Sequence, residues 1–156
     1  MISTATEADK PQITDITARA GVFSQEEIDS VPVMFDEYLE YSTEGDGYNF
    51  LVYRESDRVL GYAIFGYRDL TDGVYDLYWI AVDPSARKKG VGRALTTACE
   101  EAVRAKGGRM LIAETSSTAE YESTREFYIR VGYVNEATIK DFYKPGDDLK
   151  IYTKRV

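Results

Sequence analysis

The sequence of 156 residues fits one domain with one hydrophobic core, so residues 1–156 are expected to form a single domain. Histidine is absent and Cys99 is the only cysteine, which excludes histidine-based catalysis, internal disulfides and zinc sites with several cysteines. The formal net charge of −8 disfavours nucleic-acid binding and suits a cationic partner.

Signals for membranes, export and metals are missing from the sequence. No apolar run reaches the roughly 18 residues of a membrane span, and the N-terminus lacks a basic stretch followed by an apolar one. We therefore expect a cytoplasmic protein without a membrane partner. No EF-hand spacing is present, so no metal cofactor is expected, and a homodimer is left open.

Two helices are predicted at the start of the chain. A capping-box pattern and apolar residues at helical spacing predict the first over residues 6–21. Ser24 and Glu27 repeat the capping pattern before a second helical stretch, in which Pro32 is expected to break or kink the helix. Residues 43–47 read as a polar loop.

Three strands and a long helix are predicted next. Residues 50–54, 59–67 and 74–82 are rich in β-branched and aromatic residues and are separated by turn sequences. The third strand is nearly all apolar, which indicates a central strand covered on both faces. Residues 90–106 form an amphipathic pattern, and Cys99 on its apolar stripe is expected to be a core residue and not a nucleophile.

The C-terminal part of the sequence is predicted to form a buried strand over residues 110–113 and then a loop and helix over residues 118–131. Two further strands, residues 133–143 and 149–155, are joined by a turn containing proline and glycine. Helices and strands thus alternate around one sheet, which predicts an α/β (α+β) fold.

The strongest chemical signal is Arg87-Lys88-Lys89-Gly90-Val91-Gly92-Arg93, between the apolar strand and the amphipathic helix. Glycine lets a ligand approach the backbone closely, and the first turn of a helix offers free N–H groups and a positive dipole end. Four basic residues in an acidic chain add charge at the same place. Together these features predict an anion cradle suited to a pyrophosphate, although the spacing is not that of a P-loop.

These residues resemble the Gcn5-related N-acetyltransferases, the GNAT family. Their coenzyme A signature, Arg/Gln-x-x-Gly-x-Gly/Ala at a helix start, is similar to Arg87, Gly90 and Gly92, and the order of elements is similar along nearly the whole chain. The resemblance implies a mixed, mostly antiparallel sheet of about seven strands with about four helices. It also implies acetyl-CoA as cosubstrate, with binding residues Ile80, Ala81, Val82, Arg87, Lys88, Lys89, Gly90, Val91, Gly92 and Arg93.

A second motif of that family, Asn-x-x-Ala-x-x-x-Tyr before Gly-Phe/Tyr, is similar to the sequence ending at Tyr128. The resemblance implies that Tyr128 protonates the leaving thiolate, which suits a phenol with an ordinary pKa of about 10. The family's asparagine position is occupied by Tyr121 and its alanine position by Thr124. Tyr121 is therefore the candidate for the coenzyme contact that the asparagine normally makes.

Two carboxylates are candidates for the general base. Glu114 lies just after the apolar residues 110–113, and the resemblance to ribosomal-protein alanine N-acetyltransferases implies a glutamate base there. Asp76 lies in the apolar strand, where histone-type members of the family carry a glutamate. A carboxylate in such a strand is costly unless it is paired, hydrated or functional, and each residue alone is also compatible with a structural role.

The expected activity is direct transfer of an acetyl group from acetyl-CoA to an amine, either a small molecule or a peptide N-terminus. The alternative is a non-catalytic acyl-CoA-binding module that senses or regulates. The acceptor, cationic or peptide, is expected to contact the first helices and the loops at residues 40–47 and 143–148.

Overall fold

A computed structural model describes residues 1–41 and 47–156, and it forms a seven-stranded sheet in the order β1-β2-β3-β4-β5-β7-β6. Every neighbouring pair is antiparallel except β4 and β5, which are parallel. The mixed, mostly antiparallel sheet is thus confirmed. Its strands are β1 (Ile2–Thr4), β2 (Asn49–Glu55), β3 (Arg58–Tyr67), β4 (Val74–Val82), β5 (Met110–Ser116), β6 (Val134–Lys144) and β7 (Asp147–Arg155).

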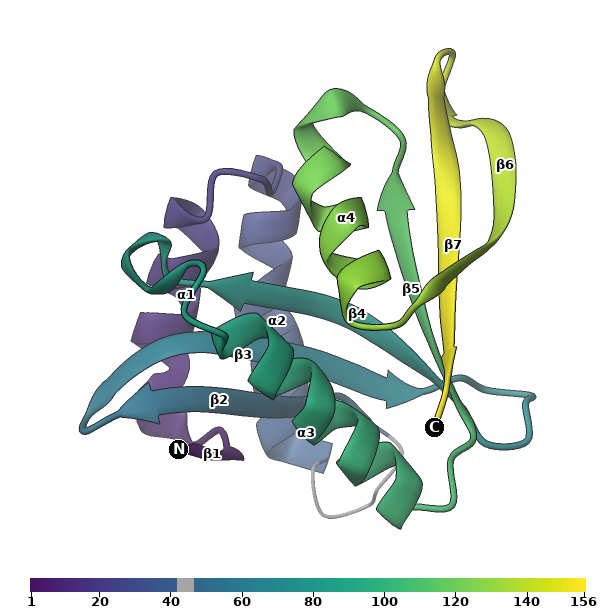
Figure 1. Ribbon diagram of the computed structural model, residues 1–156. Coiled ribbons are helices and arrows are strands. Elements are labelled where there is room, and N and C mark those ends of the chain that lie inside the picture. The colour runs from purple at the N-terminus through teal and green to yellow at the C-terminus, as the bar shows by residue number, and fades with distance from the viewer. Residues whose placement is uncertain (42–46) are drawn as a thin grey trace.

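Within the described part of the chain, four α-helices cover the two faces of this sheet (Figure 1). Helices α1 (Lys10–Arg19) and α2 (Gln25–Tyr41) pack on one face, and α3 (Val91–Ala105) and α4 (Glu122–Arg130) pack on the other. From Tyr62 to Phe65 of β3, side chains alternate between the two core clusters, because successive residues of a strand point to opposite faces. None of the helices in the described ranges combines the length and apolarity that a membrane crossing requires.

Helix α3 follows the amphipathic pattern expected from the sequence. Its apolar stripe is buried against the sheet at Val91, Leu95, Cys99 and Val103. Cys99 is fully buried, and this burial raises the pKa of its thiol above the ordinary value. The thiol therefore stays protonated, and Cys99 is confirmed as a core residue.

Helix α2 corrects the prediction for Pro32. The helix continues from Gln25 to Tyr41 with Pro32 inside it, so of the two expected outcomes, a break or a kink, the break is wrong. A proline removes one hydrogen bond of the helix, but Val31 and Phe35 on either side are fully buried in the core. Packing of this apolar face holds the helix together where the local sequence disfavours it. Most of the predicted polar loop, residues 43–46, lies outside the described residues.

The C-terminal strands differ from the expectation mainly in length. Strand β5 extends to Ser116, so Glu114 lies within it and not after it, and β7 begins at Asp147. Strand β6 forms one edge of the sheet and is exposed along its whole length, and with β7 it makes the hairpin that rises at the right of Figure 1. The short edge strand β1 carries too few residues for its alternation to be recognised in the sequence.

Candidate active site

The central strands β4 and β5 separate partway along their length, and this opening positions the site. Their parallel pairing covers only Val74–Asp76 on β4 and Met110–Ile112 on β5. Beyond those residues β4 runs on to Val82 and β5 to Ser116, and the two strands diverge (Figure 1). A bulge in β4 at Tyr78 shifts its register with β3 at the same level. The facing edges of β4 and β5 are therefore free to contact ligands.

The outer half of β4 presents backbone groups to this opening. The Asp83 N–H donates to the Leu60 carbonyl at 2.9 Å, and the β3–β4 register pairs Ala81 with Tyr62. Because hydrogen bonding alternates along an antiparallel pair, Ala81 directs its backbone groups toward β3. Ile80 and Val82 direct theirs away from β3, into the opening. Of the three strand residues expected at the coenzyme, these two have free backbone donors and acceptors.

A cavity of about 780 Å³ extends from this edge of β4 to the start of α3 and across to α4. Gly90 precedes the helix with a φ of +83°, a conformation that favours glycine, and the first turn of α3 offers the N–H groups of Val91, Gly92 and Arg93. A Cβ at Gly92 would lie 3.1 Å from the Phe127 ring of α4. Glycine at this position thus lets α3 and α4 approach each other closely beside the cavity.

Basic side chains surround the same helix start. Arg87, Lys88 and Arg93 line the cavity together with Arg130 of α4, whereas Lys89 does not line it. The Arg87 guanidinium also donates to the Ala20 carbonyl at the end of α1, and that of Arg93 donates to the Arg130 carbonyl at 3.3 Å. These side chains bring positive charge to the free N–H groups, as an anion cradle requires.

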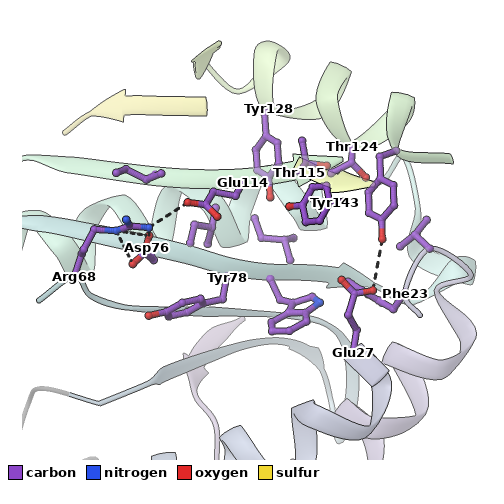
Figure 2. Close-up of a pocket in the computed structure, with 16 residues that line it drawn as sticks. Phe23, Glu27, Arg68, Asp76, Tyr78, Glu114, Thr115, Thr124, Tyr128 and Tyr143 are labelled. Atoms are coloured by element: carbon purple, nitrogen blue, oxygen red, sulfur yellow. Dashed lines mark hydrogen bonds and ion pairs between the residues drawn. The ribbon is translucent and has the colours of Figure 1, made fainter. Parts of the chain in front are cut away.

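A second, smaller cavity of about 280 Å³ adjoins the first, with its lining drawn from α2, β4, β5, α4 and the β6–β7 hairpin (Figure 2). Aromatic side chains make up much of its wall: Phe23, Tyr78, Trp79, Tyr121, Tyr128 and Tyr143. Its charged lining residues are three carboxylates, Glu27, Asp76 and Glu114, and one guanidinium, that of Arg68. This cavity is therefore acidic and aromatic where the larger one is basic.

Arg68 holds both carboxylates that were predicted as general bases. Its guanidinium contacts both oxygens of Asp76, with the shortest distance 2.6 Å from Nη2 to Oδ1, and its Nη2 lies 3.3 Å from Glu114 Oε1 (Figure 2). These bonds raise the pKa of Arg68, chiefly through Asp76. Asp76 is nearly buried and fully engaged, whereas Glu114 is 42% exposed and keeps one oxygen free of Arg68.

Tyr128 stands where the two cavities meet. Five residues line both cavities: Val22, Phe23, Ile80, Thr124 and Tyr128. The Tyr128 ring is buried among Phe127, Tyr133 and Tyr152, and its hydroxyl points into the smaller cavity (Figure 2). Burial raises the pKa of Tyr128 above its ordinary value, so the hydroxyl keeps its proton at neutral pH.

Tyr121, which the sequence predicted at the coenzyme, lies in the smaller cavity and does not line the larger one. Tyr121, in the short 3-10 helix η3 (Ala119–Tyr121), lines the smaller cavity, where its hydroxyl lies 3.5 Å from Glu27 Oε2. Ser123 of α4, and not Tyr121, lines the larger cavity. Sequence reasoning did not identify Arg68, Glu27 or Phe23, since only the tertiary fold brings them to the site.

The splayed sheet, the glycine-containing helix start and the joined cavities are those of an acetyltransferase. The sequence profile of the acetyltransferase (GNAT) domain matches residues 46–135. A crystal structure from Desulfovibrio desulfuricans, described as an acetyltransferase of the GNAT family, is 38% identical, with a TM-score of 0.95 over 99% of this chain and 98% of that one. The chain therefore belongs to the GNAT family of acetyltransferases.

More distant structures share the fold. A ribosomal-protein-alanine N-acetyltransferase from Brucella melitensis is 24% identical, with a TM-score of 0.80 over 100% of this chain and 99% of that one. A protein from Salmonella typhimurium, solved with its cofactor acetyl-CoA, is 21% identical, with a TM-score of 0.76 over 99% and 92% of the two chains. No curated protein sequence matches the chain at a significant level.

Proposed function

We propose that this protein transfers an acetyl group from acetyl-CoA directly to a primary amine. The observation that carries the proposal is the junction of a basic cavity with an acidic, aromatic one, with Tyr128 in the wall of both. The larger cavity would hold the coenzyme and the smaller one the amine. The two substrates would then meet at the residues common to both cavities.

The residues of the larger cavity fit acetyl-CoA. The free N–H groups at the start of α3, with Lys88 and Arg93 beside them, would hold the pyrophosphate, and the backbone of Ile80 and Val82 would pair with the pantetheine arm. Phe127 would pack beside it, in contact with Gly92. When bound, acetyl-CoA supplies an activated acetyl thioester to the junction of the cavities.

Four groups of the chain would then have separate roles. Glu114, which keeps one oxygen free, would accept the amine's proton directly or through a water molecule. The Ile80 N–H, at the junction, would stabilise the oxyanion while the new C–N bond forms. Tyr128, protonated at neutral pH, would give its proton to the thiolate as the C–S bond breaks. Asp76, with both oxygens bonded to Arg68, would orient that arginine and Glu114.

A primary-amine acceptor is supported by two kinds of observation. The carboxylates of the smaller cavity attract the protonated amines that predominate at neutral pH. The resemblance of the segment around Glu114 to ribosomal-protein alanine N-acetyltransferases supports chemistry on amines as well. A module that only binds acyl-CoA would need the larger cavity alone, and the carboxylates beside Tyr128 would then serve no ligand.

The proposal is tested by measuring thiol release from acetyl-CoA in the presence of amino acids, diamines, polyamines and peptides with free N-termini. We expect release that depends on both the protein and an amine, with the acetylated amine detected by mass spectrometry. Binding of acetyl-CoA without acetylation of any amine in the panel would instead identify a non-catalytic acyl-CoA-binding module.

A further inference from the structure

The smaller cavity contains one carboxylate that has no cationic partner among the described residues. Asp76 and Glu114 share the guanidinium of Arg68, but Glu27 forms no ion pair within residues 1–41 and 47–156. Figure 2 shows Glu27 across the cavity from Tyr128, on the side of α2. A carboxylate in a partly enclosed, aromatic environment is stabilised by a positive charge beside it. Glu27 therefore stands where a cationic ligand would be stabilised.

The fold orders Glu27 before any ligand arrives. It lies in the first turn of α2, and its Oε2 accepts from the Ser24 N–H at 2.7 Å while the Ser24 hydroxyl accepts from the Glu27 N–H at 3.2 Å. The Tyr121 hydroxyl lies 3.5 Å from the same carboxylate, and burial together with Glu27 raises the pKa of Tyr121 to about 12. Both neighbours are thus donors, and they hold the carboxylate in place facing the cavity.

Among the residues that the structure describes, the cavity lining offers no free cation to an acceptor that carries its own carboxylate. Arg68 is the only basic residue in the lining that the described ranges contribute, and Asp76 and Glu114 already bond to its Nε and Nη2. A free amino acid would place its carboxylate near three protein carboxylates without a counter-charge. The lining therefore disfavours amino acids and favours acceptors that are purely cationic.

An amine must be neutral when it attacks the thioester, so the reacting nitrogen does not need a permanently charged partner at that moment. We propose that Glu27 binds a second positive charge of the acceptor, and that the preferred acceptors are diamines with an apolar body between their two nitrogens. One nitrogen would reach the junction beside Tyr128 and the other would pair with Glu27. The walls formed by Phe23, Trp79 and Tyr143 would contact the apolar body. This inference rests on the proposed function and specifies its acceptor.

The test compares the diamine cadaverine with hexylamine, its isostere in which a methyl group replaces one amine. For the unaltered protein we expect kcat/KM to be roughly 10- to 100-fold higher for cadaverine, the range of a hydrogen bond to a charged group. Glu27→Gln keeps the size and the capping acceptor and should remove this preference through a higher KM for cadaverine, with hexylamine unchanged. Glu26→Gln, an exposed neighbour outside the cavity lining, makes the same change in net charge and should preserve the preference.

Direct binding supplies a readout that does not depend on turnover. Calorimetry of the protein with coenzyme A bound should show cadaverine binding that Glu27→Gln weakens at least tenfold and Glu26→Gln leaves intact. Equal kcat/KM for the two amines in the unaltered protein would overturn the inference while leaving acetyl transfer to amines established. Equal losses for both amines in Glu27→Gln would also overturn it, because Glu27 would then act on the reacting nitrogen. Failure of the proposed function differs from both, since no amine would then be acetylated.

Discussion

The two cavities of this protein are built in different ways. The larger one is formed by a short contiguous stretch, residues 87–93, together with the free edge of β4 and one face of α4, and much of its chemistry comes from backbone groups. The smaller one draws side chains from α2, β4, β5, the η3 segment and the β6–β7 hairpin. A cavity made of backbone in a local motif can be recognised in a sequence, whereas one made of scattered side chains cannot. The sequence therefore predicts the use of a coenzyme but does not predict which amine is the acceptor.

Tyr128 belongs to both cavities, so its substitution should have the largest effect. Tyr128→Phe keeps the buried ring and removes the hydroxyl that would protonate the leaving thiolate. We expect kcat to fall by about 10²- to 10⁴-fold, the usual contribution of a general acid, with the affinity for acetyl-CoA nearly unchanged. Steady-state kinetics combined with calorimetry measure the two quantities separately. If only the KM for acetyl-CoA changed, Tyr128 would belong to the coenzyme cavity alone.

Gly92→Asp is directed at the larger cavity alone. The new carboxylate would lie among N–H groups suited to phosphate, and its Cβ would press on the Phe127 ring. We expect acetyl-CoA affinity to fall by about 100-fold or more, as for a lost charge-assisted contact together with repulsion. Gly92→Ala is the control, since it introduces the same Cβ without the charge. Normal affinity in a folded Gly92→Asp protein would locate the phosphate cradle elsewhere.

Substitutions of Glu114 and Asp76, the two carboxylates bonded to Arg68, should separate two roles within the smaller cavity. Glu114→Gln should reduce kcat by roughly 10- to 100-fold near neutral pH if Glu114 accepts the amine's proton. The defect should shrink as pH rises toward the pKa of the amine, because free amine no longer needs a base. Asp76→Asn should cause a smaller defect without such rescue. A pH-rescued defect in Asp76→Asn with a normal Glu114→Gln protein would reverse the two roles, and no rescue in either would indicate proton loss to water.

Asp83 follows β4 directly and lines neither cavity, so its substitution should affect stability more than rate. Its buried carboxylate binds Arg19 of α1 at 2.9 Å, and this bond, with those of Ser85 and Arg58, holds its pKa well below the ordinary range. A depressed carboxyl pKa stabilises the fold above the unfolded pKa of about 4, and this stability is lost as pH falls through the lower folded pKa. Asp83→Asn should lower the free energy of unfolding by about 1–2 kcal/mol at neutral pH, a modest value because Arg19 is partly exposed.

Denaturant unfolding of the parent and Asp83→Asn proteins at pH values from neutral to acidic measures this contribution. The difference in unfolding free energy between them should narrow as pH drops below about 4. A difference independent of pH would mean that the amide disturbs packing and that the charge of Asp83 contributes nothing.

The sequence allows much of the fold to be predicted because its patterns are local. The stripe of α3 that includes Leu95 and Cys99 has the period of a helix with one buried face. The nearly continuous apolar run of β4 is typical of a central strand. Pro32 shows the limit of this reasoning, since its local preference is overridden by packing of its neighbours in the core. The strand β1 is fixed by its pairing with β2, which no local pattern reveals.

The residues of the candidate site also fall into two groups, those that local sequence predicts and those that only the tertiary fold brings together. Arg87, Gly90 and Gly92 lie within one short stretch and Tyr128 belongs to a second motif, so local sequence suffices to nominate them. Glu27 is seen in the sequence only as a helix cap, because its place in a cavity depends on how α2 packs beside β4 and η3. Likewise, nothing near Arg68 in the sequence indicates that it bonds to Glu114, 46 residues away.

The most direct test of the account is a crystal structure of the protein with acetyl-CoA bound. We expect the pyrophosphate to accept hydrogen bonds from the N–H groups at the start of α3, and the pantetheine arm to pair with Ile80 and Val82. The acetyl group should then lie at the junction of the cavities, within hydrogen-bonding reach of the Tyr128 hydroxyl. An acetyl group directed away from Tyr128, or a coenzyme bound outside the larger cavity, would contradict the central claim that the two cavities bring the thioester and the amine together.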